Sequence, residues 1–418
     1  MLQKKFFSLF LFLLAAIPTL FGQVPGFYMK EESRKKEIPF LVSNNLIILP
    51  VSINESPPVN FLLDTGVKTN ILFSKTLGDL IGLNYTRKLD LVGADGQTVL
   101  TASVSPTNHL DLGPIEGIFQ TILVLDEDFL ELERVIGVPV YGVIGFEFFK
   151  YNPVKIDYDE GVISFYRSDA FKRKPFGFRK LPIKIENSKP YIQAKVKQNA
   201  VAELEVKLLI DTGANHGLLL NRETSDQIIL PKEHLESDLG RSLGGDLYGF
   251  VARTRRIKLS NLKFSNLITS FPDETEFSYV IKDSGRQGSL GSELLGRMNI
   301  ILDYAREKIY IKKGSTFHEP FEYDMSGITA RVIPGEEKRF YISEVRESSP
   351  AYQAGARAND EFVSINTIPL DFWELSDLIK IFRSEEGREI TLILKRYIDE
   401  NPENFELKEV KFKLKRQI

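Results

Sequence analysis

The sequence contains no cysteine, which excludes several kinds of chemistry at once. Without a thiol there can be no disulfide bond, no zinc-thiolate site and no cysteine nucleophile. Histidine is also scarce: the four present are His109, His216, His234 and His318, and no two of them have the spacing of a metal site. We therefore expect neither a metal nor a cofactor. With 418 residues, 43% of them hydrophobic, the chain has enough apolar material for two or three domains.

An excess of charge of one sign is absent as well. Lys and Arg total 54 against 57 Asp and Glu, so the net charge is −3. A nucleic-acid surface needs a basic excess, and we expect no nucleic-acid partner. The basic runs at 34–36 and 172–174 are short enough to be solvated loop charge. The acidic stretch 157–161 lacks the spaced oxygen ligands of a calcium loop, so turn chemistry explains it better.

A long apolar run is found at the N-terminus. Lys4 and Lys5 precede the almost wholly apolar stretch 6–14, and small residues follow it. This order is typical of a secretory signal peptide, which we predict over residues 1–22. The run is too short to favour a permanent membrane span, although an uncleaved anchor is the alternative. We expect an exported protein, periplasmic or secreted.

What the sequence does contain is a repeated turn. Residues 61–66 and 208–213 each consist of three apolar residues followed by Asp-Thr-Gly. The apolar residues predict a buried strand, and the glycine allows a sharp turn after the acid. One such tripeptide would be ordinary turn chemistry. However, a carboxylate between apolar strands is costly unless it is hydrogen-bonded or protonated. Two of them on repeated scaffolds indicate that Asp64 and Asp211 face each other.

The residues downstream of the two turns repeat as well. Gly145 lies 81 residues after the first aspartate, and Gly291 lies 80 residues after the second. Each glycine follows an apolar stretch, and Asp157 and Asp303 come 12 residues after their respective glycines. A tripeptide that recurs by chance would not carry matched downstream segments with it. The chain therefore contains an internal duplication.

The repeated motifs resemble the aspartic proteases, most closely the retropepsin-like branch found in bacterial proteins. The resemblance covers roughly residues 40–313 and implies a mainly β fold of the pepsin/retropepsin type, with lobes at 38–167 and 180–313. Segment 23–39 would then be a pro-segment or a tether. Most retropepsins dimerise to assemble two acids, whereas this chain carries both. We accordingly expect a monomer that acts on polypeptides.

The resemblance also implies a mechanism. Asp64 and Asp211 would form a catalytic dyad that hydrolyses peptide bonds through a bound water, as an aspartic-type endopeptidase does. Two close carboxylates cannot both ionise, so one would act as the base and the other as the acid, as in aspartic-protease dyads generally. Residues that the family uses to support the two catalytic loops are matched here by Thr65, Gly66, Thr212 and Gly213.

Two glycine-containing hairpin tips fall where the family has flaps. Mobile flaps need glycine for their turns and an apolar or aromatic side chain to press on substrate. The alternative for both tips is a plain surface hairpin. The flap candidates are Gly93, Asp95 and Gly96 in the first lobe, and Gly244, Gly245 and Tyr248 in the second.

From about residue 320 the sequence resembles a bacterial PDZ domain, which we assign to 320–418. Ser349-Pro350-Ala351 and a later Ala-Gly lead to Asn359-Asp360 and an apolar strand. Asn359 replaces the usual glycine, and asparagine tolerates the left-handed backbone that such a turn requires. The resemblance implies a groove for a C-terminal peptide, although the domain could instead only brace the fold. Its predicted groove residues are Gly327, Ile328 and Thr329.

Two departures from the family pattern bear on the activity. Val67 stands where the family usually has alanine or serine, and Ser289 stands where an apolar residue is usual. The main alternative function is therefore a catalytically inactive, exported peptide-binding scaffold on the same fold. A hydrolase of another acyl or glycosidic bond is a third possibility. His216 lies five residues after Asp211 and could reach the site, but a structural or surface role is favoured.

Overall fold

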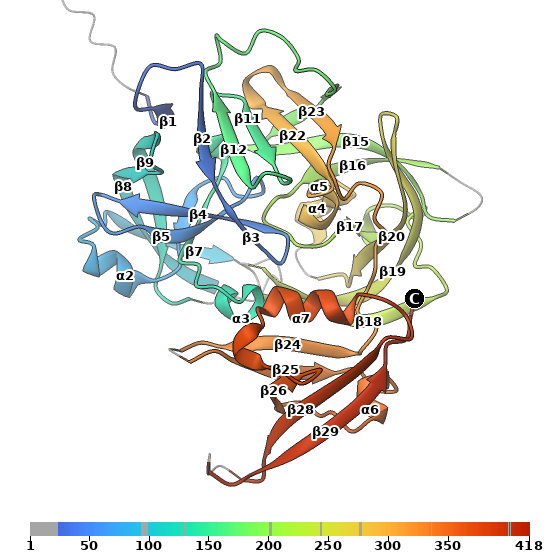
Figure 1. Cartoon of the computed structure of the whole chain (residues 1–418). Coiled ribbons are helices and arrows are strands. Elements are labelled where there is room, and N and C mark those ends of the chain that lie inside the picture. The colour runs from blue at the N-terminus through green and yellow to red at the C-terminus, as the bar shows by residue number, and fades with distance from the viewer. Residues whose placement is uncertain are drawn as a thin grey trace, which may run out of the picture.

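The computed structural model describes residues 24–92, 99–128, 130–199, 203–242, 245–275, 278–335, 337–399, 401 and 403–418. The predicted signal peptide therefore lies outside the described residues. The predicted mainly β fold is confirmed, because β-sheets form both lobes and the C-terminal domain (Figure 1). Within the described ranges, no helix combines the length and apolar character needed to span a membrane.

The first lobe is a nine-stranded sheet. Its spatial order is β1 (Gly26–Met29), β9 (Ile115–Leu125), β6 (Asn70–Leu72), β10 (Gly142–Ile144), β5 (Val59–Leu63), β4 (Leu46–Ile53), β8 (Val99–Asp111) and β7 (Arg87–Val92), with β3 (Leu41–Ser43) beside β4. β8 also pairs with β9, which closes the sheet on itself. Two short helices flank it, α2 (Lys75–Leu80) and α3 (Leu132–Ile136).

The second lobe repeats this plan in eight strands. Their spatial order is β14 (Lys184–Glu186), β15 (Lys189–Lys197), β16 (Leu204–Ile210), β21 (Gly288–Leu290), β17 (Leu218–Leu220), β20 (Leu262–Pro272), β19 (Gly245–Leu259) and β18 (His234–Ser242). β15 also pairs with β19, and the helices are α4 (Ser278–Asp283) and α5 (Ser292–Leu295). In both lobes the strand before Asp-Thr-Gly runs parallel to a later three-residue strand, which is β10 or β21.

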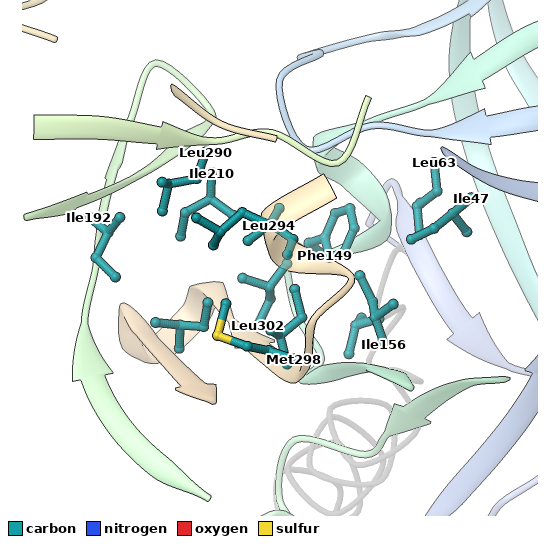
Figure 2. Close-up of a cluster of buried hydrophobic side chains, with 14 of the residues drawn as sticks. Ile47, Leu63, Phe149, Ile156, Ile192, Ile210, Leu290, Leu294, Met298 and Leu302 are labelled. Atoms are coloured by element: carbon teal, nitrogen blue, oxygen red, sulfur yellow. The ribbon is translucent and has the colours of Figure 1, made fainter. Parts of the chain in front are cut away.

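A six-stranded sheet joins the lobes. Its order is β13 (Arg179–Pro182), β23 (Lys308–Lys313), β22 (Met298–Asp303), β11 (Val154–Asp157), β12 (Val162–Tyr166) and β2 (Lys35–Pro39). The two lobes meet where β11 pairs with β22. One buried apolar cluster runs through both lobes, and Figure 2 labels its members Ile47, Leu63, Phe149, Ile156, Ile192, Ile210, Leu290, Leu294, Met298 and Leu302.

The segment that the sequence left open as a pro-segment or tether contributes strands to the fold. β1 pairs with β9 of the first lobe, and β2 pairs with β12 of the joining sheet. Phe27 and Ile38 from these strands are buried in the shared core. Removing the segment would therefore expose core residues and the edges of two sheets.

The C-terminal domain has its own sheet and its own apolar cluster. The sheet contains β24 (Ile328–Ile333), β25 (Arg339–Val345), β26 (Glu361–Ile365), β28 (Glu389–Tyr397) and β29 (Phe405–Lys413), with β27 (Ile368–Pro369) beside β26. Its helices are α6 (Pro350–Gln353) and α7 (Leu375–Phe382). Asn359 adopts φ +69°, so asparagine does supply the left-handed turn at this position.

This domain touches both lobes. α3 of the first lobe lies against β24, beside α7 (Figure 1). On the second lobe, Arg331 pairs with Asp238 of β18 at 3.0 Å. Arg253 of β19 donates to the backbone oxygen of Ile418 at 3.1 Å. The C-terminal domain therefore bridges the two lobes rather than attaching to one of them.

Candidate active site

The two aspartates occupy equivalent places at the ends of equivalent strands. Asp64 directly follows β5, and its backbone N–H donates to the oxygen of Ile144 at 2.9 Å. Asp211 directly follows β16, and its N–H donates to the oxygen of Leu290, also at 2.9 Å. In each lobe the short parallel strand thus fixes the backbone of the acid. This explains why Val143-Ile144-Gly145 and Ser289-Leu290-Gly291 recur downstream of the two turns.

The threonines join the two turns to each other. The Thr65 hydroxyl donates to the oxygen of Ile210 at 2.6 Å, and the Thr212 hydroxyl donates to the oxygen of Leu63 at 2.8 Å. Each hydroxyl also accepts a bond from the other threonine's backbone N–H, at 3.1 and 3.0 Å. Both threonines are fully buried, so water does not compete for these four bonds. The loops are therefore held at a fixed separation.

The glycines bring backbone close to the carboxyl groups. The Gly66 N–H donates to Asp64 Oδ1 at 2.6 Å, and the Gly213 N–H donates to Asp211 Oδ1 at 3.1 Å. A Cβ atom on Gly213 would lie only 2.2 Å from the Asp64 carboxyl carbon. The two carboxyl groups are themselves within hydrogen-bond reach of each other. Both aspartates are half-buried.

This arrangement changes the protonation of one acid. Burial raises the pKa of Asp64 to about 8 from its ordinary 3.8, and the charge of Asp211 adds to the rise. The Gly66 amide and the charge of Lys189 oppose the shift without cancelling it. At neutral pH the Asp64 carboxyl therefore keeps its proton. A carboxyl group that keeps its proton at neutral pH can serve as a general acid.

Replacing Asp64 with Asn should stabilise the protein, and more so at pH 7 than at pH 4. The unfolded chain loses the Asp64 proton near pH 3.8, whereas the folded chain keeps it up to about pH 8. Between these values the folded state binds more protons, so this group's contribution to stability falls as pH rises. We expect a gain of at least about 1 kcal/mol at pH 7, the equivalent of roughly one pKa unit. Urea unfolding of both proteins at the two pH values measures it, and an equal effect at both would contradict the shifted pKa.

Further residues support the loops, and sequence comparison of the two copies did not find them. Asn70 accepts a bond from the Gly145 N–H at 3.1 Å, and the Ser292 hydroxyl donates to the oxygen of Thr212 at 2.9 Å. At the position equivalent to Asn70 or Ser292, the other copy of the repeat has a residue of different chemistry. A search for matched positions therefore passes over them.

The two departures from the family pattern have local partners. Val67 packs against a buried apolar cluster of the first lobe. The Ser289 hydroxyl lies 2.9 Å from Nε2 of His216. Burial lowers the pKa of His216, and the charge of Asp211 opposes that change. Ser289 and His216 are thus a polar pair beside the second turn, in agreement with a structural role for the histidine.

Of the flap candidates, Gly93, Asp95, Gly96 and Gly244 lie outside the described residues. Gly245 begins β19 and pairs with Ser242 of β18. Tyr248 lies opposite Asp238 in the same hairpin, and 59% of it is exposed. An exposed aromatic side chain on a hairpin suits a flap, which stays a prediction.

The predicted groove residues of the C-terminal domain lie at the start of β24. Gly327 has φ +86°, and its N–H donates to Asp324 Oδ2 at 2.6 Å. The Ile328 N–H donates to the Ser326 hydroxyl at 3.0 Å, and Thr329 follows within β24. The amides expected to hold a ligand carboxylate therefore already have acceptors within the domain. A peptide C-terminus would have to replace Asp324.

Comparison with known families agrees with this geometry. Residues 49–148 and 192–294 match the aspartyl protease family, and each region contains one Asp-Thr-Gly turn. Each lobe thus matches the aspartyl protease family over most of its length. Residues 341–396 match the PDZ domain, which confirms the second resemblance. Among solved structures, basic 7S globulin from soybean is similar to 71% of this chain and 98% of its own, at 12% identity and a TM-score of 0.41. No curated protein matches the chain.

Proposed function

We propose that this protein is an aspartic-type endopeptidase with an Asp64–Asp211 dyad. The observation that carries the proposal is the pair of carboxyl groups within hydrogen-bond reach, held by symmetric loops. The elevated pKa of Asp64 supports it, because an acid that stays protonated at neutral pH can donate to a substrate carbonyl. The test is cleavage of a diverse peptide library by the wild-type chain and by Asp211→Asn. Equal cleavage by both, or none by the wild type, would refute it.

We propose different roles for the two acids. Asp211 would take a proton from a water bound between the carboxyl groups, and the water oxygen would then attack the peptide carbonyl carbon. Asp64 would donate its proton in a hydrogen bond to the carbonyl oxygen and stabilise the charge that develops there. The proton held by Asp211 would pass to the leaving nitrogen as the C–N bond breaks. No covalent intermediate with the protein is formed.

A single chain would be sufficient for this activity, since each lobe supplies one acid. We therefore propose a monomeric enzyme. We also propose that it is exported, on the basis of the leader-like N-terminal sequence. Cell fractionation that recovered the protein in the cytoplasm would refute the second point.

The PDZ domain would supply a second peptide-binding surface. PDZ domains bind a peptide as an added strand and hold its C-terminus on backbone amides. Here β24 would be the accepting strand, and α7 would supply side-chain contacts. Because α3 lies against β24 and Asp324 occupies the Gly327 amide, an incoming C-terminus would compete with contacts inside the protein.

Removing the PDZ domain should weaken cleavage of protein substrates more than cleavage of short peptides. Phe317 and Phe321 pack in the core of the lobes, and Phe321 falls within the range predicted for the PDZ domain. The truncated protein should therefore end after Tyr323, so that this core stays complete. Loss of a tethering surface would raise KM for proteins by about tenfold or more, depending on geometry, and leave short peptides nearly unaffected. Steady-state kinetics on both substrate classes is the measurement. An equal loss on both would mean that the domain only braces the lobes.

A further inference from the structure

Apolar side chains surround the first aspartate. The β4–β5 ladder pairs Ile48 with Leu62, and two residues further along it places Leu46 opposite Asp64. Leu46 is only 5% exposed, and it belongs to one buried cluster with Ile48, Leu62 and Val140. Val140 lies two residues before β10, the strand that fixes the Asp64 backbone. The first lobe thus has apolar residues, Leu46 and Val140, at these two positions near Asp64.

The second lobe has cations at the same two places. The β15–β16 ladder, continued by two residues beyond its last pair, places Lys189 opposite Asp211. Arg286 lies two residues before β21, as Val140 lies before β10. An internal duplication that keeps its loops and strands has therefore exchanged two apolar side chains for two basic ones. Folding alone does not require this exchange, because the first lobe forms the same scaffold without it.

The two cations have no ion-pair partner among the residues that the structure describes. Both are half-buried, and Nε of Arg286 is buried without a hydrogen-bond partner. They are close enough to repel each other: burial lowers the pKa of Lys189, and the charge of Arg286 lowers it further. The charges of Asp211 and Asp64 oppose this only in part. A half-buried cation without a partner is costly, so a carboxylate from a ligand would relieve both side chains.

A role in tuning the acids does not account for the pair. The charge of Lys189 does lower the pKa of Asp64, so this lysine acts on the dyad as it stands. Arg286 is not among the main influences on Asp64, but its charge lowers the pKa of Lys189 and of His216. Guanidinium and ammonium groups together favour recognition of a carboxylate. Binding of a ligand carboxylate therefore explains the presence of both cations better than adjustment of the pKa of Asp64 does.

We propose that Lys189 and Arg286 form a subsite for a substrate carboxylate beside the dyad, in the lobe where the duplication carries cations in place of the buried Leu46 and Val140. The inference rests on the proposed peptidase function and extends it to specificity: the preferred peptide has a carboxylate on the second-lobe side of the dyad. The carboxylate could come from an Asp or Glu side chain or from the C-terminus of a short peptide. Both sources have the same chemistry.

The test compares peptides that differ only by Glu or Gln at one position, placed in turn at each of the positions around the cleaved bond. At one position Glu should raise kcat/KM by about ten- to one-hundredfold, the effect of a hydrogen bond to a charged group. Lys189→Met and Arg286→Met should each reduce this preference, measured within each variant as the ratio of kcat/KM for the Glu peptide to kcat/KM for the Gln peptide. Lys195→Met is the matched control, because Lys195 lies on the same strand and pairs with Glu205 at the surface. Free and amidated C-termini distinguish the two carboxylate sources.

Several results would overturn the subsite. Equal rates for Glu and Gln peptides at every position, with no effect of a free C-terminus, would exclude it. Equal losses on Glu and Gln peptides in Lys189→Met, with a shifted pH profile, would make Lys189 a positioning residue for the dyad. Binding of the same peptides to Asp211→Asn, measured by fluorescence anisotropy, separates the two proposals. A Glu preference that depends on Lys189, in a protein whose wild type cleaves nothing, would retain the subsite and refute the peptidase.

Discussion

Replacing either Asp64 or Asp211 with Asn should lower kcat by about 10²–10⁴-fold, the range attributed to general acid–base groups. The amide has nearly the shape of the carboxyl group but can neither take a proton from water nor hold the single proton that the pair shares. The fold should remain intact, because an Asn side-chain oxygen can still accept the bonds that Gly66 and Gly213 donate. Peptide kinetics and thermal unfolding of each variant are the measurements.

Asp79→Asn is the matched control, because Asp79 lies at the surface of α2 and pairs with Lys75. It should be as active as the wild type. In the wild type, kcat should fall as the pH rises through about 8, where Asp64 loses the proton that it would donate to the substrate carbonyl. Full activity in either dyad variant, or a rate that keeps rising above pH 8, would contradict the assigned roles.

The parts that the sequence predicted are those governed by local pattern. Three apolar residues before Asp-Thr-Gly require a buried strand and a tight turn, and repetition of this unit indicated that Asp64 and Asp211 would meet. The structure places the two carboxyl groups within hydrogen-bond reach. The match to the aspartyl protease family and the mainly β fold follow from the same local features.

The parts that the sequence did not predict depend on pairing between distant residues. Nothing near β1 or β2 indicates that they pair with β9 and β12, because an edge strand is defined by its partner. In the sequence, nothing distinguishes Lys189 from other charged residues that follow a turn. Only the β15–β16 register, continued by two residues, places it opposite Asp211. Likewise, the sequence does not show that the Asp324 carboxylate accepts a hydrogen bond from the Gly327 N–H, where it would compete with a ligand carboxylate.

Replacing Gly213 with alanine should abolish most activity, whereas Gly66→Ala should cost much less. A Cβ on Gly213 would lie 2.2 Å from both Cγ and Oδ2 of Asp64, too close to tolerate without moving that carboxyl group. On Gly66 the nearest atom would be Asp64 Oδ1 at 3.0 Å, which a small shift relieves. A misplacement of about 1 Å at a reacting group can cost roughly 10²-fold. Both variants add one methyl group to a catalytic loop, and they differ only in how closely that group would approach Asp64.

A double-mutant cycle separates this steric cause from a general loss of stability. Overpacking at Gly213 should cost about 1–3 kcal/mol of unfolding free energy in the wild-type background. In an Asp64→Ala background the obstructing carboxyl group is gone, so Gly213→Ala should cost much less there. Denaturant unfolding of the four proteins gives the coupling energy. Equal costs in both backgrounds would show that Gly213 is needed for its backbone conformation, and that the close approach of its α-carbon to Asp64 does not explain why glycine occupies this position.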